Sequence, residues 1–216
     1  MNRRDFLKLS AMFSAVLIVP SLDADIIPTK NYNLKKRIKR EFERAEEHVG
    51  VDWREYSIVI NGDEQELYLG RKNFFGKYRI VKTYDISTGF YGFSNEYKSK
   101  GTPTGLHRID KKIGDGADIG TLFEKEASTG KIVEISTDKK RGRGVMVTRL
   151  LRLEGLFDEN KTTAWRGIYI HGTNREGLLG TPASDGCIRM NNEDVIELYD
   201  KVKTGTPVNI FERIIP

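Results

Sequence analysis

Residues 168–190 read IYIHGTNREGLLGTPASDGCIRM, and the rest of the chain is organised around them. The stretch begins with a short apolar strand, which His171 and Gly172 end. A glycine-rich loop then leads to Cys187, the only cysteine among 216 residues. A histidine within hydrogen-bond reach can accept a thiol proton near neutral pH and stabilise the thiolate that forms. The stretch therefore predicts Cys187 as a nucleophile and His171 as its base.

A loop must bring these two residues together, because they lie too far apart in sequence to share one helical turn. Glycines at positions 172, 177, 180 and 186 make a tight return feasible. Gly186 also leaves room for a substrate carbonyl beside backbone N–H groups, which an oxyanion hole requires. A structural alternative is that Cys187 is a small buried hydrophobic residue and His171 only a hydrogen-bonded polar one.

The pattern resembles a known family. His-Gly, a glycine-rich loop and Ser-x-Gly-Cys-Ile-Arg-Met are similar to the active-site signature of the L,D-transpeptidases, the YkuD or ErfK/YbiS/YcfS/YnhG family. Three further segments resemble the family in the same order: a first hairpin at 56–69, a Thr-Pro-Thr-Gly segment at 101–105, and a closing helix and strand at 192–210. The resemblance extends over residues 56–211.

The resemblance implies an enzyme that acts on the stem peptides of peptidoglycan. The Cys187 thiolate would attack the L-centre carbonyl of the third stem residue, release D-alanine and pass the acyl group to an amine, giving a 3→3 cross-link. Three alternatives stay open: an L,D-carboxypeptidase that uses water, attachment of a wall-anchored lipoprotein, and a non-catalytic wall-binding or morphology protein. The chemistry needs no cofactor or metal, and the sequence shows no H-x-x-x-H or paired-cysteine ligand set.

The resemblance also implies roles for neighbouring residues. The Gly172 carbonyl would orient the imidazole, and the N–H groups of Gly186 and Cys187 would hold the oxyanion. Ser184, Asp185 and Arg189 are assigned to substrate binding or loop support, with a salt bridge to the C-terminal helix as the structural alternative for Arg189.

Asp185 departs from the family, which usually has histidine there. Its carboxylate could hold the loop or meet a cationic substrate group, and its charge would tend to raise the pKa of the thiol.

Short strands separated by turn signals, with only two helices, predict a mainly β domain built as a β-sandwich. Residues 25–54 are predicted to form an N-terminal helical segment, and 55–216 are predicted to form the catalytic domain. Asn192 is expected to cap a short C-terminal helix that begins at Glu193. Residues 111–130 are rich in glycine and poor in strand signals, so they are a candidate lid. His107 follows a turn and is expected to be structural.

Residues 1–24 are predicted to be an export signal of the twin-arginine type, with Arg3 and Arg4 ahead of an apolar run at 9–19. The run is shorter than a membrane span needs. The protein is therefore expected in the periplasm or cell envelope, with membrane contact only through this signal. A basic helix at 32–49 is expected to be a solvated helix packed on the domain, with contact to anionic lipid or wall polymer as the alternative. The net charge of +5 comes with no nucleic-acid-binding signature.

Overall fold

The computed structural model describes residues 29–49, 55–140, 142 and 144–212. The predicted export signal lies outside the described residues, so it stays a prediction. None of the helices within these ranges has the length and apolar character to cross a bilayer.

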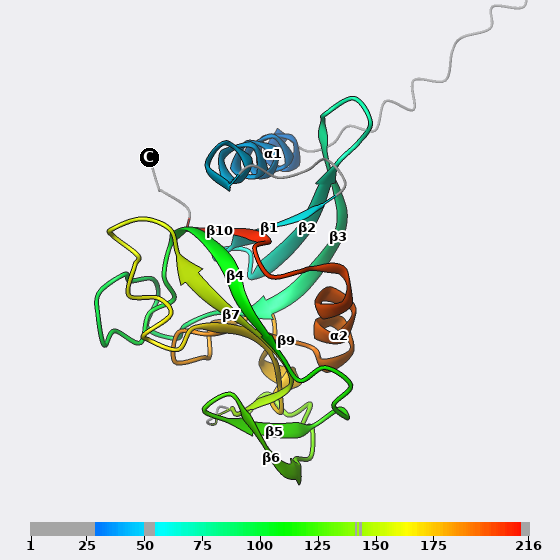
Figure 1. Ribbon diagram of the computed structural model, residues 1–216, viewed down its shortest axis with the longest axis vertical. Helices are drawn as coiled ribbons and strands as arrows, with labels where there is room; N and C mark the ends of the chain where they lie inside the picture. Colours follow the sequence, from blue (N-terminus) through cyan, green and yellow to red (C-terminus); the bar gives the residue numbers. More distant parts are fainter. Residues whose placement is uncertain (1–28, 50–54, 141, 143, 213–216) are drawn as a thin grey trace, which may run out of the picture.

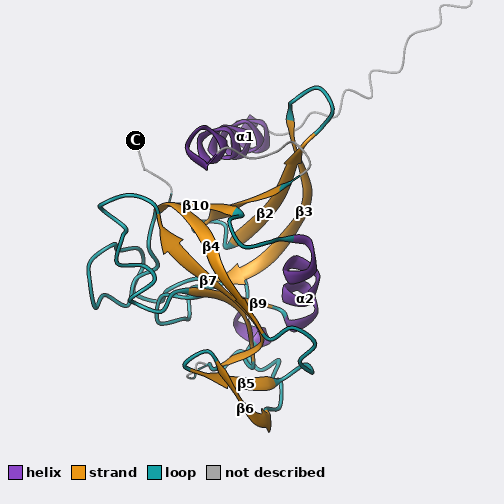
Figure 2. Cartoon of the chain, viewed as in Figure 1, coloured by secondary structure: helices purple, strands orange, loops and turns teal. Residues whose placement is uncertain are grey.

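The described chain is mainly strand, with one helix near each end, as predicted. Figure 1 labels the elements and Figure 2 separates strands from loops. In chain order they are α1 (Thr29–Val49), β1 (Tyr56–Asn61), β2 (Glu66–Lys72), β3 (Tyr78–Ser87), β4 (Gly105–Ile113), β5 (Thr121–Glu124), β6 (Ala127–Ile132), β7 (Met146–Gly155), β8 (Tyr169–Thr173), the 3₁₀ turn Glu176–Leu178, β9 (Ile188–Met190), α2 (Asn192–Lys201) and β10 (Pro207–Phe211).

The strands pair in the order β4-β10-β1-β2-β3-β9-β8-β7-β5-β6, and β4 also pairs with β7. That extra pairing closes the sheet on itself from β4 round to β7. The two faces of the predicted sandwich are therefore joined and enclose one core. Most neighbours are antiparallel, but β1 pairs with β10 and β8 with β9 in parallel. The buried residues of this core come from both ends of the chain, among them Ile58, Leu69, Leu151, Ile170, Ile188 and Val208.

Helix α1 covers the outer side of the sheet at β10, β1 and β3. Its stripe of Ile38 and Phe42 is fully buried against Val59, Tyr68 and Tyr78. Phe42 stacks on Tyr78 with ring centroids 5.1 Å apart. The apolar spacing predicted for this helix therefore builds a second, smaller core outside the main one.

The predicted cap of the C-terminal helix was wrong by one residue. The Asn191 side chain is the cap of α2, accepting from the N–H groups of Glu193 and Asp194. Asn192 is instead buried, and its side chain accepts from the Thr148 hydroxyl and donates to the Thr173 carbonyl. Two consecutive asparagines are equivalent caps by local preference, and burial of the second decides between them.

The prediction of an irregular segment at 111–130 was also wrong. Strand β4 continues to Ile113, and β5 and β6 form a hairpin whose two-residue turn is Lys125 and Glu126. Both turn residues have positive φ, 46° and 70°, as the tightest hairpin turns require. Glycine usually supplies that conformation. Because this turn contains no glycine, the local sequence did not indicate a hairpin.

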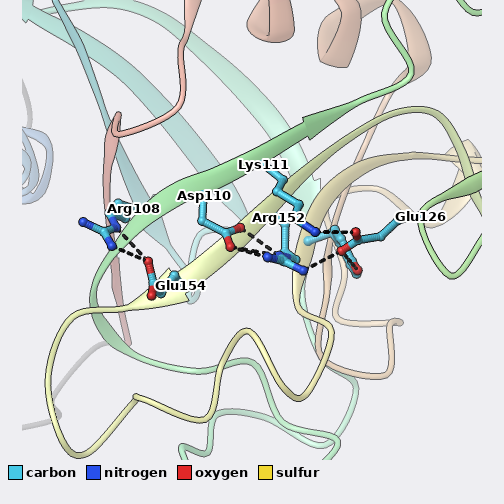
Figure 3. A network of polar contacts seen from close by, with 7 residues as sticks. Arg108, Asp110, Lys111, Glu126, Arg152 and Glu154 are labelled. Carbon is cyan, nitrogen blue, oxygen red and sulfur yellow. Dashed lines mark hydrogen bonds and ion pairs between the residues drawn. The ribbon is translucent and has the colours of Figure 1, made fainter.

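Ion pairs hold this turn in place (Figure 3). Glu126 accepts from Lys111 at 3.0 Å and from Arg152 at 2.8 Å. It also accepts from the Tyr169 hydroxyl at 3.0 Å. Burial alone would raise the pKa of Glu126, but the bonds from Lys111 and Tyr169 and the charge of Arg152 lower it. The hairpin is therefore fastened to β4, β7 and β8.

Candidate active site

The strand register brings His171 and Cys187 onto one face of the sheet. Parallel pairing sets Ile170 beside Ile188 and His171 beside Arg189. Side chains alternate along a strand, so Ile170 and Ile188 enter the core while His171 and Arg189 point to the opposite face. Cys187 precedes Arg189 by two residues and shares that face, where it packs with Phe123 and Tyr169.

A cleft of about 690 Å³ lies over this face. His171, Cys187 and Arg189 line it together, as do Ser184 and Asp185 of the preceding loop. The β5–β6 hairpin and the residues before β7 complete the wall, contributing Leu122, Phe123, Glu124, Lys125, Gly144, Val145 and Met146. The segment considered as a lid therefore does border the site, as a fastened hairpin.

The backbone carbonyl of Gly172, the next residue, fixes the orientation of the His171 imidazole. Nδ1 lies 2.7 Å from the Gly172 carbonyl oxygen, so Nδ1 carries the proton in the neutral ring and Nε2 keeps its lone pair. The side chain is only 3% exposed. The pKa of His171 is lowered to about 4, because burial and the charge of Arg189 lower it by more than the hydrogen bond to the Gly172 carbonyl raises it. The resting ring is therefore neutral at pH 7.

The thiol of Cys187 is partly buried and also neutral at rest. Sγ donates to the Gly167 carbonyl at 3.4 Å. Burial raises the pKa of the thiol, while the Tyr169 backbone N–H and the charge of Arg189 lower it. Asp185 raises it, in the direction predicted, but as a smaller influence than Arg189. The net direction is upward, so the cysteine does not exist as a preformed thiolate.

The loop before the cysteine is a tight turn built by Ser184. Its hydroxyl donates to the Cys187 carbonyl at 2.6 Å and accepts from the Gly186 N–H at 3.0 Å. Gly186 has φ +114°, and a Cβ there would lie 3.1 Å from the Gly101 carbonyl oxygen. Glycine is thus required by both conformation and space. The Gly186 N–H predicted for an oxyanion hole is occupied by Ser184 in this conformation.

The Thr-Pro-Thr-Gly segment supports this turn from behind. Thr102 is fully buried, and its hydroxyl donates to the Gly186 carbonyl at 3.0 Å. It also accepts from the Gly89 N–H at 2.8 Å. Arg166 donates to the carbonyls of Ser94 and Gly101 and so holds the same segment. Sequence reasoning missed Arg166, and no local signal marks it, because its partners lie far away in the chain.

Arg189 is buried, at 5% exposure, and its Nη1 has no partner within the described part of the chain. No carboxylate of those residues forms an ion pair with it, so the salt bridge to the C-terminal helix is not seen. Asp185 is exposed instead and pairs with Lys100 at 3.6 Å. A buried cation facing a cleft is costly unless an anion joins it there.

A protein-family model matches most of the chain. The model of the YkuD L,D-transpeptidase catalytic domain matches residues 55–210. The chain is 40% identical over 84 residues to the putative L,D-transpeptidase YkuD of Bacillus licheniformis, covering 38% of this chain and 49% of that protein. It is 48% identical over 52 residues to the putative L,D-transpeptidase YqjB of Bacillus subtilis, covering 24% and 30%. The matches thus span about half the length of these curated relatives or less.

Solved structures show a weaker likeness. An L,D-transpeptidase from Mycobacterium smegmatis has a TM-score of 0.45 and 17% identity, over 73% of this chain and 58% of that one. An L,D-transpeptidase from Xylanimonas cellulosilytica has a TM-score of 0.44 and 21% identity, over 73% and 60%. The assignment therefore rests on the domain model, which covers more than half of the chain. The chain belongs to the family of YkuD L,D-transpeptidase catalytic domains.

Proposed function

We propose that this protein is a peptidoglycan L,D-transpeptidase in which Cys187 is the nucleophile and His171 the general base. The observation that carries the proposal is the shared cleft. His171 lies in β8 and Cys187 directly precedes the adjacent strand β9, both line one cavity, and the Gly172 carbonyl leaves Nε2 as the free base of the ring. This is the nucleophile, base and orienting group that covalent acyl transfer needs.

The resting protonation states favour proton transfer during attack. No hydrogen bond joins the His171 ring to Sγ within the described residues, because Sγ donates to the Gly167 carbonyl. Rotation about χ1 of Cys187 would turn the sulfur toward Nε2. The proton then moves to Nε2 as the C–S bond forms, and the imidazolium returns it to the departing amine of D-alanine. An amine of a second stem peptide would break the thioester and regenerate the thiol.

Two further groups would stabilise charge. The Cys187 N–H would hold the oxyanion, and the Gly186 N–H would join it if the Ser184 hydroxyl released it. Arg189 would meet a carboxylate of the substrate, since it is the buried cation of the cleft without an ion-pair partner in the described chain. Ser184 would keep the turn in shape.

The protein would act in the cell envelope after export by the segment at 1–24. Peptidoglycan stem peptides lie outside the cytoplasmic membrane, and no cofactor is involved in the reaction as written. A fusion of this segment to a reporter that is active only after twin-arginine export would test the route. Loss of export on replacing Arg3 and Arg4 with lysine is expected.

The test of function is incubation with purified disaccharide tetrapeptide, followed by mass spectrometry. Cys187-dependent dimers joined 3→3 are expected, and Cys187→Ala should give none. Tripeptide without dimers, even with excess acceptor, would make the protein an L,D-carboxypeptidase. Transfer only to a lipoprotein lysine would make it an attachment enzyme. An unchanged substrate in both samples would refute the proposal and leave a wall-binding role.

A further inference from the structure

Two phenylalanines stand out from the end of the molecule opposite the β5–β6 hairpin. Phe74 and Phe75 occupy the turn between β2 and β3 (Figure 1) and are 86% and 82% exposed. These are the highest exposures of any large apolar side chain in the described ranges. Exposure of two adjacent aromatic rings to water is unfavourable unless the rings are buried in an apolar environment on binding.

The turn is an ordered platform for these rings. The Asn73 side chain accepts from the N–H groups of Phe75 and Lys77, each at 3.0 Å. Asn73 and Lys77 also pair through their backbones at 2.9 Å, and Gly76 supplies φ +72°. The rings meet edge to face with centroids 5.8 Å apart. Both rings are thus presented outward by a defined backbone.

A basic surface flanks the turn. A groove of about 460 Å³ between α1 and β3 is lined by Lys35, Lys36, Lys39, Tyr78, Arg79 and Ile80. The lysines and Arg79 are exposed, as is Lys77 in the turn itself. Residues 33–40 of α1 include five basic residues and no acidic one. Two carboxylates of α1, Glu46 and Glu43, lie near Tyr78 at the base of the hairpin, and Glu46 is paired with Lys72.

We propose that this surface, the Phe74–Phe75 turn with the basic groove beside it, docks on an anionic lipid bilayer. The rings would enter the boundary between headgroups and acyl chains, and the lysines would face lipid phosphates. A protein partner fits less well, because a stable protein interface needs a broad packed apolar centre and this turn is narrow and edged by charge. A soluble polyanion would use the lysines and leave the rings in water.

Docking at this surface would orient the active site. The hairpin of β2 and β3 and the hairpin of β5 and β6 lie at opposite ends of the long axis (Figure 1). The cleft containing Cys187 is walled by the β5–β6 hairpin. A protein held by its Phe74–Phe75 turn would therefore present the cleft away from the bilayer. This inference concerns a second surface and does not depend on the proposed transpeptidase activity.

A probe at the turn itself tests the proposal in the full chain. Cys187→Ser removes the native thiol, and Phe75→Cys then carries a single environment-sensitive nitrobenzoxadiazole label. With vesicles of phosphatidylcholine and phosphatidylglycerol, a blue shift and a several-fold gain in fluorescence are expected. The matched control is Ile132→Cys with the same label, an exposed position on β6, which should not respond. Both variants must keep the urea midpoint of their Cys187→Ser parent.

Charge gives the second readout. Replacing Lys35, Lys36 and Lys39 with glutamine should raise the half-saturating lipid concentration roughly a hundredfold, because each basic residue near an anionic surface contributes about fivefold in affinity. Phosphatidylcholine vesicles alone should give little response. If the protein sediments with vesicles while the label at 75 stays in water, the N-terminal segment makes the contact and the proposal is wrong. No sedimentation, or equal response at positions 75 and 132, would also overturn it.

Discussion

Two buried histidines should make the protein lose stability as the pH falls from neutral. His107 is fully buried, with Nδ1 2.9 Å from the Gly105 carbonyl oxygen and Nε2 3.2 Å from the Thr163 hydroxyl. Burial lowers its pKa to about 4, as it does for His171, from an ordinary value of 6.5. The unfolded chain therefore binds more protons than the folded one between these values. The stability is fully present above pH 6.5 and is lost progressively as the pH falls toward 4.

The size of the loss follows from the two pKa values. At pH 5 an unfolded histidine with pKa 6.5 is almost fully protonated, while a folded one with pKa near 4 is mostly neutral. The difference is about 2 kcal/mol for each histidine and about 4 kcal/mol for both. Because single domains are stable by only about 5–15 kcal/mol, this is a large fraction of the total.

Urea unfolding at pH 8 and pH 5, followed by fluorescence, measures the loss. The double variant His107→Gln and His171→Gln keeps neutral side chains at every pH, and its carboxylates titrate as in the parent. Its loss between the two pH values should be smaller than that of the parent by about 4 kcal/mol. Each single variant should remove about half of the difference. Equal losses of stability in the parent and the double variant would refute the inference that both histidines are buried in the neutral form.

Three further changes test the supports of the site. Gly172→Ala places a Cβ 2.5 Å from Asn192 Oδ1 and 2.8 Å from the Val147 carbonyl oxygen, so thermal unfolding should show a loss of about 1–3 kcal/mol from overpacking, and unchanged stability would contradict the contact. Asn192→Ala removes the acceptor of the buried Thr148 hydroxyl, so thermal unfolding should show a loss of about 1–3 kcal/mol in stability. An unchanged stability would mean that water replaces the amide, and would contradict this prediction. Asp185→His removes the charge that raises the pKa of the thiol, so iodoacetamide should alkylate Cys187 faster. The increase should be small because the carboxylate is exposed, and a slower rate would contradict this prediction.

Local patterns predicted the elements that carry the site. The first hairpin, the strand that contains His171 and the helix after Met190 were all readable, because alternation and turn residues fix backbone conformation over a few positions. The predicted end of that strand at His171 and Gly172 was wrong, since β8 continues to Thr173. The same reasoning missed the β5–β6 hairpin. Its turn, Lys125 and Glu126, has no glycine and is held by Lys111, Arg152 and Tyr169 from other strands. Ion pairs with residues of other strands stabilise this turn in place of a local turn signal.

The sequence by itself determined the chemistry available to this protein: one thiol, a histidine in a short apolar strand, and a glycine that allows the turn between Ser184 and Cys187. The tertiary structure decided where these groups meet. Parallel pairing of β8 and β9 turns His171 and Cys187 to one face and one cleft, where the imidazole is buried. Register and burial depend on strands from the whole chain, so no local pattern contains them.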